Sequence, residues 1–195
     1  MKIVCLGDSL TFGFKMTREN TWPRIVEKEL NIKVLNKGIC GDTTAGMLSR
    51  FRADVIDEQP THLILMGGTN DLVFQLERSI IYSNIATMIY QAYHYNIILI
   101  VGISIPIVPH IAKEYFNLAD DFQRVNRELL LFREWILGFS SLINFETIDF
   151  FYEFYDPALM MGKESLYIDG VHPTVDGNKK MAQLVLRSIE KYKMI

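Results

Sequence analysis

Short apolar runs of strand length alternate along this chain with longer segments of mixed polarity. The runs lie at residues 3–6, 32–35, 62–66, 97–103 and 142–148, and most are nearly continuous in Val, Ile and Leu. Strands that alternate with helices of about ten or more residues are typical of βαβ units, whose strands are parallel. Parallel strands are covered on both faces, so they need no polar side. The pattern therefore predicts a parallel sheet between two layers of helices.

The segments between these runs predict the helical layers. We expect helices over Trp22–Leu30, Thr44–Glu58, Ser79–Tyr95 and Thr174–Lys193, and another that places Phe122, Val125, Leu129, Phe132 and Ile136 on one face. The chain has 195 residues and no repeat, low-complexity segment or long charge block, so we expect one domain over residues 1–195. The predicted fold class is α/β, a three-layer α/β/α sandwich around a parallel sheet of about five strands.

Composition and charge exclude several classes of protein. Lys and Arg number 20 against 23 Asp and Glu, which gives a net charge of −3 and no basic footprint for nucleic acid. The longest apolar stretch, residues 97–108, is broken by Gly102 and Pro106 and is shorter than the ~18 residues of a membrane helix, so we expect no stable membrane insertion. Cys5 and Cys40 are too few for a disulfide framework or a metal cluster. With no signal peptide visible, we expect a cytoplasmic protein.

Polar, glycine-containing segments follow the predicted strands. Residues 7–11, 36–43 and 67–71 each come directly after an apolar run, and residues 169–173 precede the last predicted helix. In open α/β sheets, ligands bind beyond the carboxyl ends of the strands. We therefore expect these segments to meet and to form the functional site.

Three side chains in these segments match the needs of acyl transfer. Ser9 follows Gly7 on a strand-to-helix turn, which exposes its hydroxyl as a candidate nucleophile. His172 is a candidate base, and Asp169, three residues earlier, can accept from the other nitrogen of the imidazole. Pro173 disfavours helical backbone at His172 and so keeps it out of the following helix. Taken alone, each side chain has a plainer interpretation as a helix cap, a turn acid or a surface histidine.

A tetrahedral intermediate also needs donors for its oxyanion. The candidates are the Ser9 N–H, the Gly41 N–H and the Asn70 amide, because glycine allows close approach to its backbone and asparagine carries side-chain N–H groups. Gly41 and Asn70 are also common turn residues, which is the alternative for both. The neighbouring acids Asp8 and Asp71 are expected to be structural and to hold their loops through backbone N–H groups.

Four blocks in this order resemble those of the SGNH or GDSL family of serine esterases and lipases. They are Gly7-Asp8-Ser9-Leu10, Gly41 in Gly41-Asp42-Thr43, Asn70 in Gly68-Thr69-Asn70-Asp71, and Asp169-x-x-His172-Pro173. The resemblance implies a flavodoxin-like hydrolase fold and an ester hydrolase with Ser9, Asp169 and His172 as catalytic residues. It also implies an oxyanion hole made by Ser9, Gly41 and Asn70, with no metal and no other cofactor. An α/β-hydrolase is a poor alternative, because residues 7–11 lack the second glycine of the G-x-S-x-G elbow.

The substrate pocket is the least defined part of this interpretation. Leu72, Phe74, Ile107 and Val108 are apolar residues that follow two of the predicted strands, and they are the candidate walls for an acyl chain. Ile107 and Val108 belong to a long loop, residues 105–120, for which a mobile lid and a surface loop packed on the core are both open.

The expected substrates are short to medium acyl esters, as in lysophospholipases, arylesterases and thioesterases, hydrolysed through an acyl-enzyme on Ser9. The expected partner is thus a small-molecule acyl ester, and the sequence does not define an oligomeric state. One alternative is an O-deacetylase of a small acetylated sugar or metabolite. A second is an inert binding protein on the same fold, which should lack one of the blocks, and none is missing.

Overall fold

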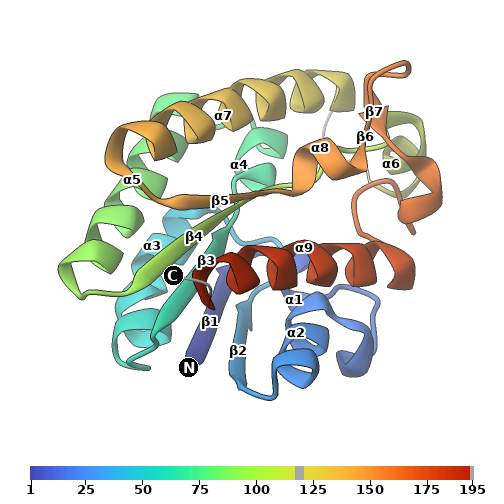
Figure 1. Cartoon of the computed structure of the whole chain (residues 1–195). Helices are drawn as coiled ribbons and strands as arrows, with labels where there is room; N and C mark the ends of the chain where they lie inside the picture. The colour runs from blue at the N-terminus through green and yellow to red at the C-terminus, as the bar shows by residue number, and fades with distance from the viewer. Residues whose placement is uncertain (117–120, 194–195) are drawn as a thin grey trace.

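The computed structural model describes residues 1–116 and 121–193, and its centre is a sheet of five parallel strands (Figure 1). The strands are β1 (Lys2–Gly7), β2 (Lys33–Gly38), β3 (His62–Met66), β4 (Ile98–Ile103) and β5 (Glu146–Asp149). Their order in the sheet is β2-β1-β3-β4-β5, and a separate antiparallel pair joins β6 (Tyr155–Asp156) to β7 (Met161–Gly162). The parallel sheet is the one that the alternating pattern predicts.

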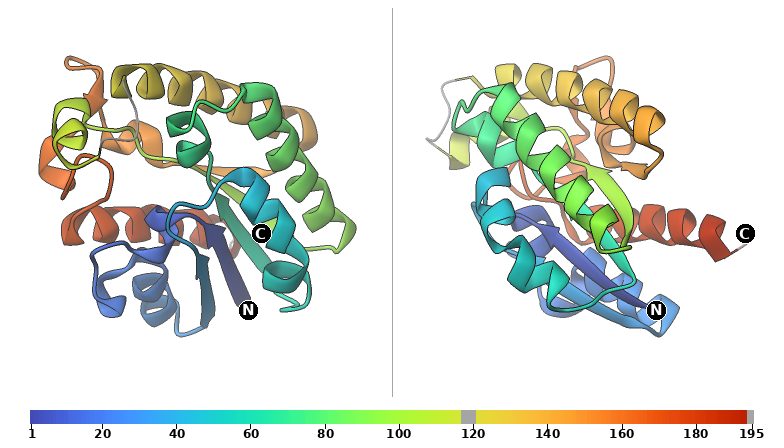
Figure 2. Two further views of the ribbon diagram at one scale, coloured as in Figure 1. Left: turned by 180° about the vertical axis from the view of Figure 1, so that it is seen from behind. Right: turned by 90° about the vertical axis from the view of Figure 1, so that its left-hand side faces the viewer.

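Helices cover both faces of this sheet, as the two views of Figure 2 show. One layer holds α3 (Thr44–Phe51), α5 (Arg78–His94) and α7 (Phe122–Ile143), and the other holds α2 (Trp22–Leu30) and α9 (Val175–Lys193). Shorter helices lie in the connections: α1 (Ser9–Phe12), α4 (Thr69–Val73), α6 (Pro109–Tyr115) and α8 (Phe150–Phe154). The arrangement confirms the predicted three-layer α/β/α sandwich.

Each layer buries its own apolar core against the sheet. Along β1, Val4 and Leu6 belong to the core under α3, α5 and α7, whereas Ile3 and Cys5 belong to the core under α2 and α9. All four residues are fully buried. Successive side chains of a strand point to opposite faces, so a central strand of the sandwich, such as β1, is apolar at nearly every position, whereas the edge strands β2 and β5 also carry polar residues. Burial on both faces explains the unbroken apolar runs in the sequence.

The direction of the chain across the sheet reverses at β1. The chain passes from β1 outward to β2 and then returns to the other side of β1 as β3, which creates a crevice beyond the carboxyl ends of these strands. Gly7 pairs with both Gly38 and Met66, so the three strands end level with one another. The segments that carry the predicted site residues therefore start side by side.

The two largest differences from the predicted boundaries concern the segments 44–58 and 142–148, and the strand predicted at 32–35 also runs on to Gly38. The predicted helix at 44–58 is α3 followed by a π-helical turn, Arg52–Ile56. The predicted strand at 142–148 starts too early, because α7 runs on to Ile143 and ends only where Asn144 takes the left-handed conformation, with φ 59°. Asparagine tolerates that conformation better than most residues, so it can end a helix whose apolar pattern would otherwise continue.

The loop predicted at residues 105–120 contains the helix α6, which begins at Pro109. Proline suits the first turn of a helix because its fixed φ is helical and its missing N–H has no partner there. Residues 117–120 lie outside the described residues, so the lid remains a prediction.

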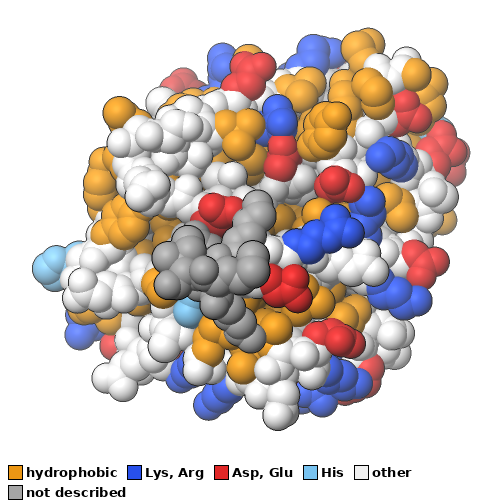
Figure 3. Space-filling model, in the orientation of Figure 1, with side chains coloured by type: hydrophobic (Ala, Val, Ile, Leu, Met, Phe, Trp, Pro, Cys, Tyr) orange, Lys and Arg blue, Asp and Glu red, His pale blue; other side chains and the backbone are white. Residues whose placement is uncertain are grey.

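No helix within the described ranges is both long and apolar enough to span a membrane. On the face drawn in Figure 3, Lys and Arg side chains are interspersed with Asp, Glu and apolar side chains. Charges on this face are thus mixed rather than separated by sign.

Candidate active site

Ser9 lies at the start of α1, immediately beyond the end of β1. Asp8 caps this short helix, because its Oδ1 accepts a hydrogen bond from the Leu10 N–H at 2.9 Å. The turn needs glycine at Gly7, where a Cβ would lie only 2.7 Å from the carbonyl oxygen of Met66. The tight turn sets the direction of Ser9, which is 8% exposed.

The structure joins Ser9 to the two other residues predicted as catalytic. The Ser9 Oγ lies 2.9 Å from His172 Nε2, although the two residues are 163 positions apart. His172 Nδ1 lies 3.1 and 3.0 Å from the two carboxylate oxygens of Asp169. The backbone N–H of His172 also donates to Asp169 Oδ1 at 2.9 Å, which holds the turn between them. The three side chains thus form one hydrogen-bonded chain.

Burial and hydrogen bonding act in opposite directions on Asp169. Its burial would raise its pKa, but hydrogen bonds from the ring and backbone of His172 and from the Val171 N–H hold that pKa well below its usual range. The resulting carboxylate favours a proton on Nδ1 of His172. Nε2, which faces Ser9, is then free to accept the hydroxyl proton. The arrangement can therefore serve a nucleophile and its general base.

The Asp8 carboxyl, next to Ser9 in the chain, shows the opposite balance. Burial, with the nearby carboxylates of Asp71 and Asp42, raises its pKa to about 7 despite the hydrogen bond from the Leu10 N–H. Its Oδ2 is buried and has no hydrogen-bond partner among the residues the structure describes. Asp71 accepts from the Thr44 N–H at 2.9 Å and from the Thr44 hydroxyl at 2.6 Å. Both acids hold backbone N–H groups, as predicted.

Gly41 and Asn70, the other predicted oxyanion donors, line the same pocket as Ser9 and His172. Gly41 has φ +78°, and the space where a Cβ would lie is open, so a ligand can approach its backbone closely. The Asn70 amide donates one N–H to the carbonyl oxygen of Asp42 at 2.8 Å. An amide nitrogen carries two hydrogens, so a second donor remains. The fold thus brings every predicted donor to one pocket.

Arg50 is a supporting residue that the sequence analysis missed. Its guanidinium donates to the carbonyl oxygens of Gly7 and Lys37 at 3.0 and 2.9 Å. It also donates to the Asp42 carboxylate at 2.8 Å. These bonds tie the end of β1 to the loop that carries Gly41. The only signal in the sequence is an acid four residues further along, a spacing common on helix surfaces.

The pocket beside Ser9 has a volume of about 190 Å³ and mostly apolar walls. Its walls are Phe14, Val73, Phe116, Phe122 and Val171, and its polar end is formed by Ser9, Cys40, Gly41, Thr69, Asn70 and His172. The Phe14 and Phe116 rings lie against the imidazole of His172, with centroids 4.4 and 5.9 Å away. Within the part of the chain that the structure describes, no three His, Cys, Asp or Glu side chains are grouped so that they could hold a metal ion.

The wall residues predicted from the sequence are placed elsewhere. Ile107 and Val108 are buried in the two cores and do not line the pocket. Leu72 is also buried in a core, and Phe74 is 48% exposed outside the pocket. Sequence shows that apolar residues follow a strand but not which way each one points, and it is Val73 that faces the pocket.

The backbone of Val108 supports the site in a different way. Its N–H donates to the carbonyl oxygen of Gly170 at 2.7 Å. Gly170 has φ +81°, and a Cβ there would lie 2.4 Å from the backbone nitrogen of Ala112. The start of α6 is therefore packed directly against the turn between Asp169 and His172. Val108 therefore supports the turn that carries the candidate base and does not contact an acyl chain in the pocket.

Comparison with known proteins identifies the family. The model of the GDSL-like lipase/acylhydrolase family matches residues 5–180. The chain belongs to this family. An arylesterase of Vibrio mimicus is 26% identical over 199 residues, an alignment that covers 98% of this chain and 89% of the arylesterase. The family and this relative agree with the predicted enzyme class, and the chain is an ester hydrolase.

Solved structures show the same fold as this GDSL hydrolase. A protein of the G-D-S-L family from Desulfitobacterium hafniense is 27% identical with a TM-score of 0.80, over 96% of this chain and 98% of that one. A GDSL-like lipase from Bacteroides thetaiotaomicron has a TM-score of 0.83 at 23% identity, over 98% of this chain and 88% of that one. At 23% identity, the similarity to the second structure supports the fold alone.

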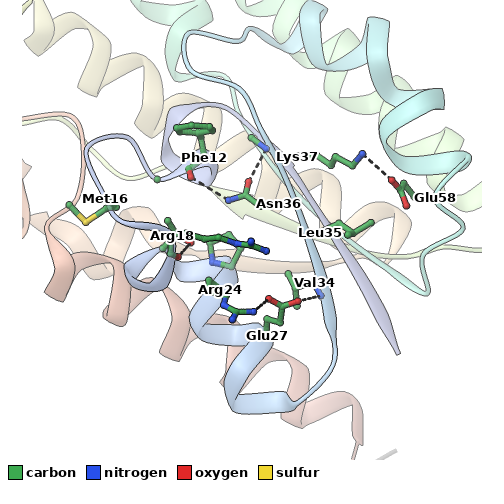
Figure 4. A pocket seen from close by; sticks show the side chains of 14 residues that line it. Phe12, Met16, Arg18, Arg24, Glu27, Val34, Leu35, Asn36, Lys37 and Glu58 are labelled. Carbon is green, nitrogen blue, oxygen red and sulfur yellow. Dashed lines mark hydrogen bonds and ion pairs between the residues drawn. The ribbon is translucent and has the colours of Figure 1, made fainter.

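A larger hollow of about 570 Å³ lies beside the edge strand of this GDSL hydrolase, between α2 and β2 (Figure 4). We call it the β2 groove; it is lined by residues of the segments 12–27 and 34–38 and by Glu58. Four of its charged side chains form ion pairs, Arg24 with Glu27 and Lys37 with Glu58. These four charges therefore already have partners, and Arg18 is the remaining charged residue that lines the groove.

Proposed function

We propose that this GDSL hydrolase cleaves short to medium acyl esters through an acyl-enzyme on Ser9. The observation that supports this most is the hydrogen-bonded chain of Ser9, His172 and Asp169 at the polar end of an apolar pocket. Ser9 Oγ attacks the acyl carbonyl carbon while His172 takes the hydroxyl proton, and Asp169 stabilises the imidazolium. His172 then gives this proton to the leaving alcohol. Water attacks the acyl-enzyme in the same way and releases the carboxylic acid and Ser9.

The oxyanion of each tetrahedral intermediate is held, in this proposal, by three donors. They are the backbone N–H groups of Ser9 and Gly41 and the second N–H of the Asn70 amide. The bond from Asn70 to the Asp42 carbonyl supports this role, because it fixes the amide before substrate arrives. Donors that need no rearrangement stabilise the transition state most effectively.

The size and lining of the pocket support a small acyl group. Its volume of about 190 Å³ is below the roughly 300–1,000 Å³ of sites for drug-sized ligands. The walls formed by Val73 and Phe122 offer no hydrogen bonds to sugar hydroxyls, so the acyl group is the part expected to enter. An O-deacetylase is the second candidate, because an acetyl group is small enough to enter the same pocket while its sugar stays outside.

The nucleophile can be tested with a fluorophosphonate, which phosphonylates an activated serine. We expect a single adduct, mapped to Ser9 by mass spectrometry and absent from Ser9→Ala. Ser49→Ala is a matched control, because the Ser49 hydroxyl only donates to a carbonyl of its own helix. A folded protein that takes no label would favour an inert binding protein.

The acyl group can be tested with p-nitrophenyl esters from acetyl to dodecanoyl, beside acetylated xylose. We expect kcat/KM to be highest for short to medium chains and to fall for the longest. A strict preference for acetylated sugar would replace the ester proposal with the deacetylase.

A further inference from the structure

The segment that follows α1 turns back over the hydrogen-bonded chain of Ser9, His172 and Asp169. It makes this turn with two residues in the left-handed region, Gly13 with φ 87° and Lys15 with φ 60°. Glycine adopts that region freely, but a lysine rarely does, and such strain persists only where the surroundings impose it. The contacts of the Lys15 side chain are therefore of interest.

The ammonium of Lys15 connects three segments that are distant in the sequence. Its Nζ lies 3.2 Å from Oδ2 of Asp169, with the lysine side chain 40% exposed and the carboxylate fully buried. The same nitrogen lies 5.4 Å from the centre of the Phe14 ring and 5.0 Å from that of Tyr115 in α6. Both distances are in the range of a cation–π contact. The ammonium is thus held between a carboxylate and two aromatic rings.

The two oxygens of Asp169 are held differently. Oδ1 accepts the backbone N–H groups of Val171 and His172, which belong to the same turn. Oδ2 accepts from His172 Nδ1 and from Lys15. Lys15 therefore supplies the one described contact to Oδ2 from outside that turn. Its neighbour Phe14 lies against the imidazole itself, so consecutive residues hold both the acid and the base.

We propose that Lys15 is a positioning residue: through the Asp169 carboxylate it sets the orientation of His172, and through Tyr115 it ties α6 to the site. This proposal rests on the role of His172 as general base in the proposed function. The ammonium restrains rotation of the carboxylate, and the carboxylate in turn aligns the imidazole with Ser9 Oγ. Misplacement of reacting groups by about 1 Å can cost up to about a hundredfold in rate.

The charge of Lys15 also affects the pH range in which the proposed base, His172, is unprotonated and able to accept a proton. The described groups in contact with His172 are Asp169 from its own loop, Ser9 from α1, and the uncharged rings of Phe14 and Phe116. The Cys40 thiol lines the same pocket, and its pKa is raised by burial. Lys15 is the cation on the far side of the carboxylate. A nearby cation disfavours a second proton on the imidazole, so its removal lets the protonated, inactive ring persist to higher pH. The acid limb of the kcat/KM profile reports this proton.

Lys15→Met tests the proposal, because methionine keeps an apolar stem between the rings and removes the charge. We expect kcat for a p-nitrophenyl ester to fall about tenfold with KM nearly unchanged, and the acid limb of kcat/KM to move to higher pH. Lys15→Arg should restore most of kcat and the original limb, since it keeps a cation that can donate to Asp169. Lys179→Met is the matched control, because it removes an exposed lysine that is paired with Asp176 on α9.

Two outcomes would overturn the positioning role. One is a Lys15→Met enzyme with the kcat and pH profile of the parent; the other is an equal loss in Lys15→Met and Lys15→Arg, which would indicate packing alone. Thermal unfolding of each variant separates either result from a loss of fold. Ser9→Ala keeps the tests distinct: full turnover by that variant would remove the proposed function, whereas an inactive Ser9→Ala beside a normal Lys15→Met would remove only the role of Lys15.

Discussion

The β2 groove and the pocket beside Ser9 differ in size and, more usefully, in how their polar groups are satisfied. The groove is the larger, about 570 Å³ against about 190 Å³. Four of its ionised side chains are partly exposed and form ion pairs with one another, Arg24 with Glu27 and Lys37 with Glu58. In the smaller pocket, Ser9 and His172 are almost fully buried and converge on one point between apolar walls. We therefore assign the proposed chemistry to the smaller pocket, because its polar groups are buried and have spare hydrogen-bonding capacity.

A carboxyl group from each region shows the same difference. Hydrogen bonds from Lys2 and Lys37 lower the pKa of Glu58, beside the groove, to about 2. Burial raises the pKa of Asp8, beside Ser9, to about 7. The charged form of the carboxyl group is thus stabilised at Glu58 and disfavoured at Asp8.

The largest expected effect comes from removing the candidate base. His172→Ala should lower kcat for ester hydrolysis by roughly 10⁴-fold or more, as loss of a group in such a triad does. Lys37→Met, which removes a charge of the groove, should leave kcat within about twofold, because exposed ion pairs contribute little. Steady-state kinetics on a p-nitrophenyl ester measures both. An equal loss of kcat in the two variants would show that the pocket beside Ser9 is no more important for activity than the β2 groove.

Removal of one oxyanion donor should have the next largest effect. Asn70→Ala is expected to lower kcat by about 10²–10³-fold and to leave the protein folded. Asn36→Ala in the groove is the matched control, since its amide also donates to a backbone carbonyl, that of Thr11 at 2.8 Å. Circular dichroism checks the fold of each. An Asn70→Ala enzyme as active as Asn36→Ala would exclude the donor role.

The Asp8 carboxyl should make the stability of the fold depend on pH. Its pKa is 3.8 ordinarily and about 7 in the fold, so the folded state binds more protons between these values. Its contribution to the free energy of unfolding is therefore full below about pH 4 and is lost as the pH rises through about 7. The loss is of the order of a few kcal/mol, since a tenfold change in proton affinity is worth about 1.4 kcal/mol.

Asp8→Asn should flatten this dependence in urea unfolding curves recorded at about pH 4 and about pH 7. Asparagine keeps an oxygen for the Leu10 N–H and carries no charge. Glu58→Gln is the corresponding variant in the groove, and Glu58 affects the pH dependence of the free energy of unfolding in the opposite direction. Because the pKa of Glu58 is lowered, its contribution is present at neutral pH and is lost as the pH falls towards about 2. A slope between pH 4 and 7 that survives Asp8→Asn would place its origin elsewhere.

The smallest expected effect concerns the walls of the pocket. Val73→Ala should improve kcat/KM for an ester with a longer acyl chain, relative to acetate, by about fourfold for each methylene accommodated. Phe12→Ala, in the groove, should leave the ratio between the two esters unchanged. The ratio is measured with mixed substrates in one reaction. An unaltered preference in Val73→Ala would show that the acyl chain lies elsewhere.

Sequence analysis could place the candidate catalytic side chains because backbone constraints position them. Ser9 follows a strand and a glycine turn, and His172 is separated from its helix by Pro173, so both must lie near the carboxyl edge of a parallel sheet. The parallel sheet and the three layers follow from the alternation of strands and helices, whereas the strand order comes from the structure. The blocks themselves carry this information, and family membership agrees with it.

The walls of the site could not be predicted in the same way. Ile107 and Phe116 are both apolar residues after β4, yet one is buried in a core and the other covers His172. Their directions depend on α6, whose position is set by contact with Gly170, far along the chain. Lys15 carries no signal in the sequence either, because its partner Asp169 is 154 residues away. Such contacts exist only once the fold has formed.

The hydrogen bond between Ser9 and His172 spans 163 positions of the chain, and this separation has a consequence for synthesis. Translation releases Ser9 early, with β1 and α1, and adds His172 only just before α9. A hydrogen bond from the Trp22 N–H to the Asn178 side chain joins α9 to the start of α2. In the proposed mechanism, a nascent chain therefore carries its nucleophile, Ser9, before the base that would activate it has been added. On this proposal Ser9 becomes reactive only when the turn before α9 has reached the sheet.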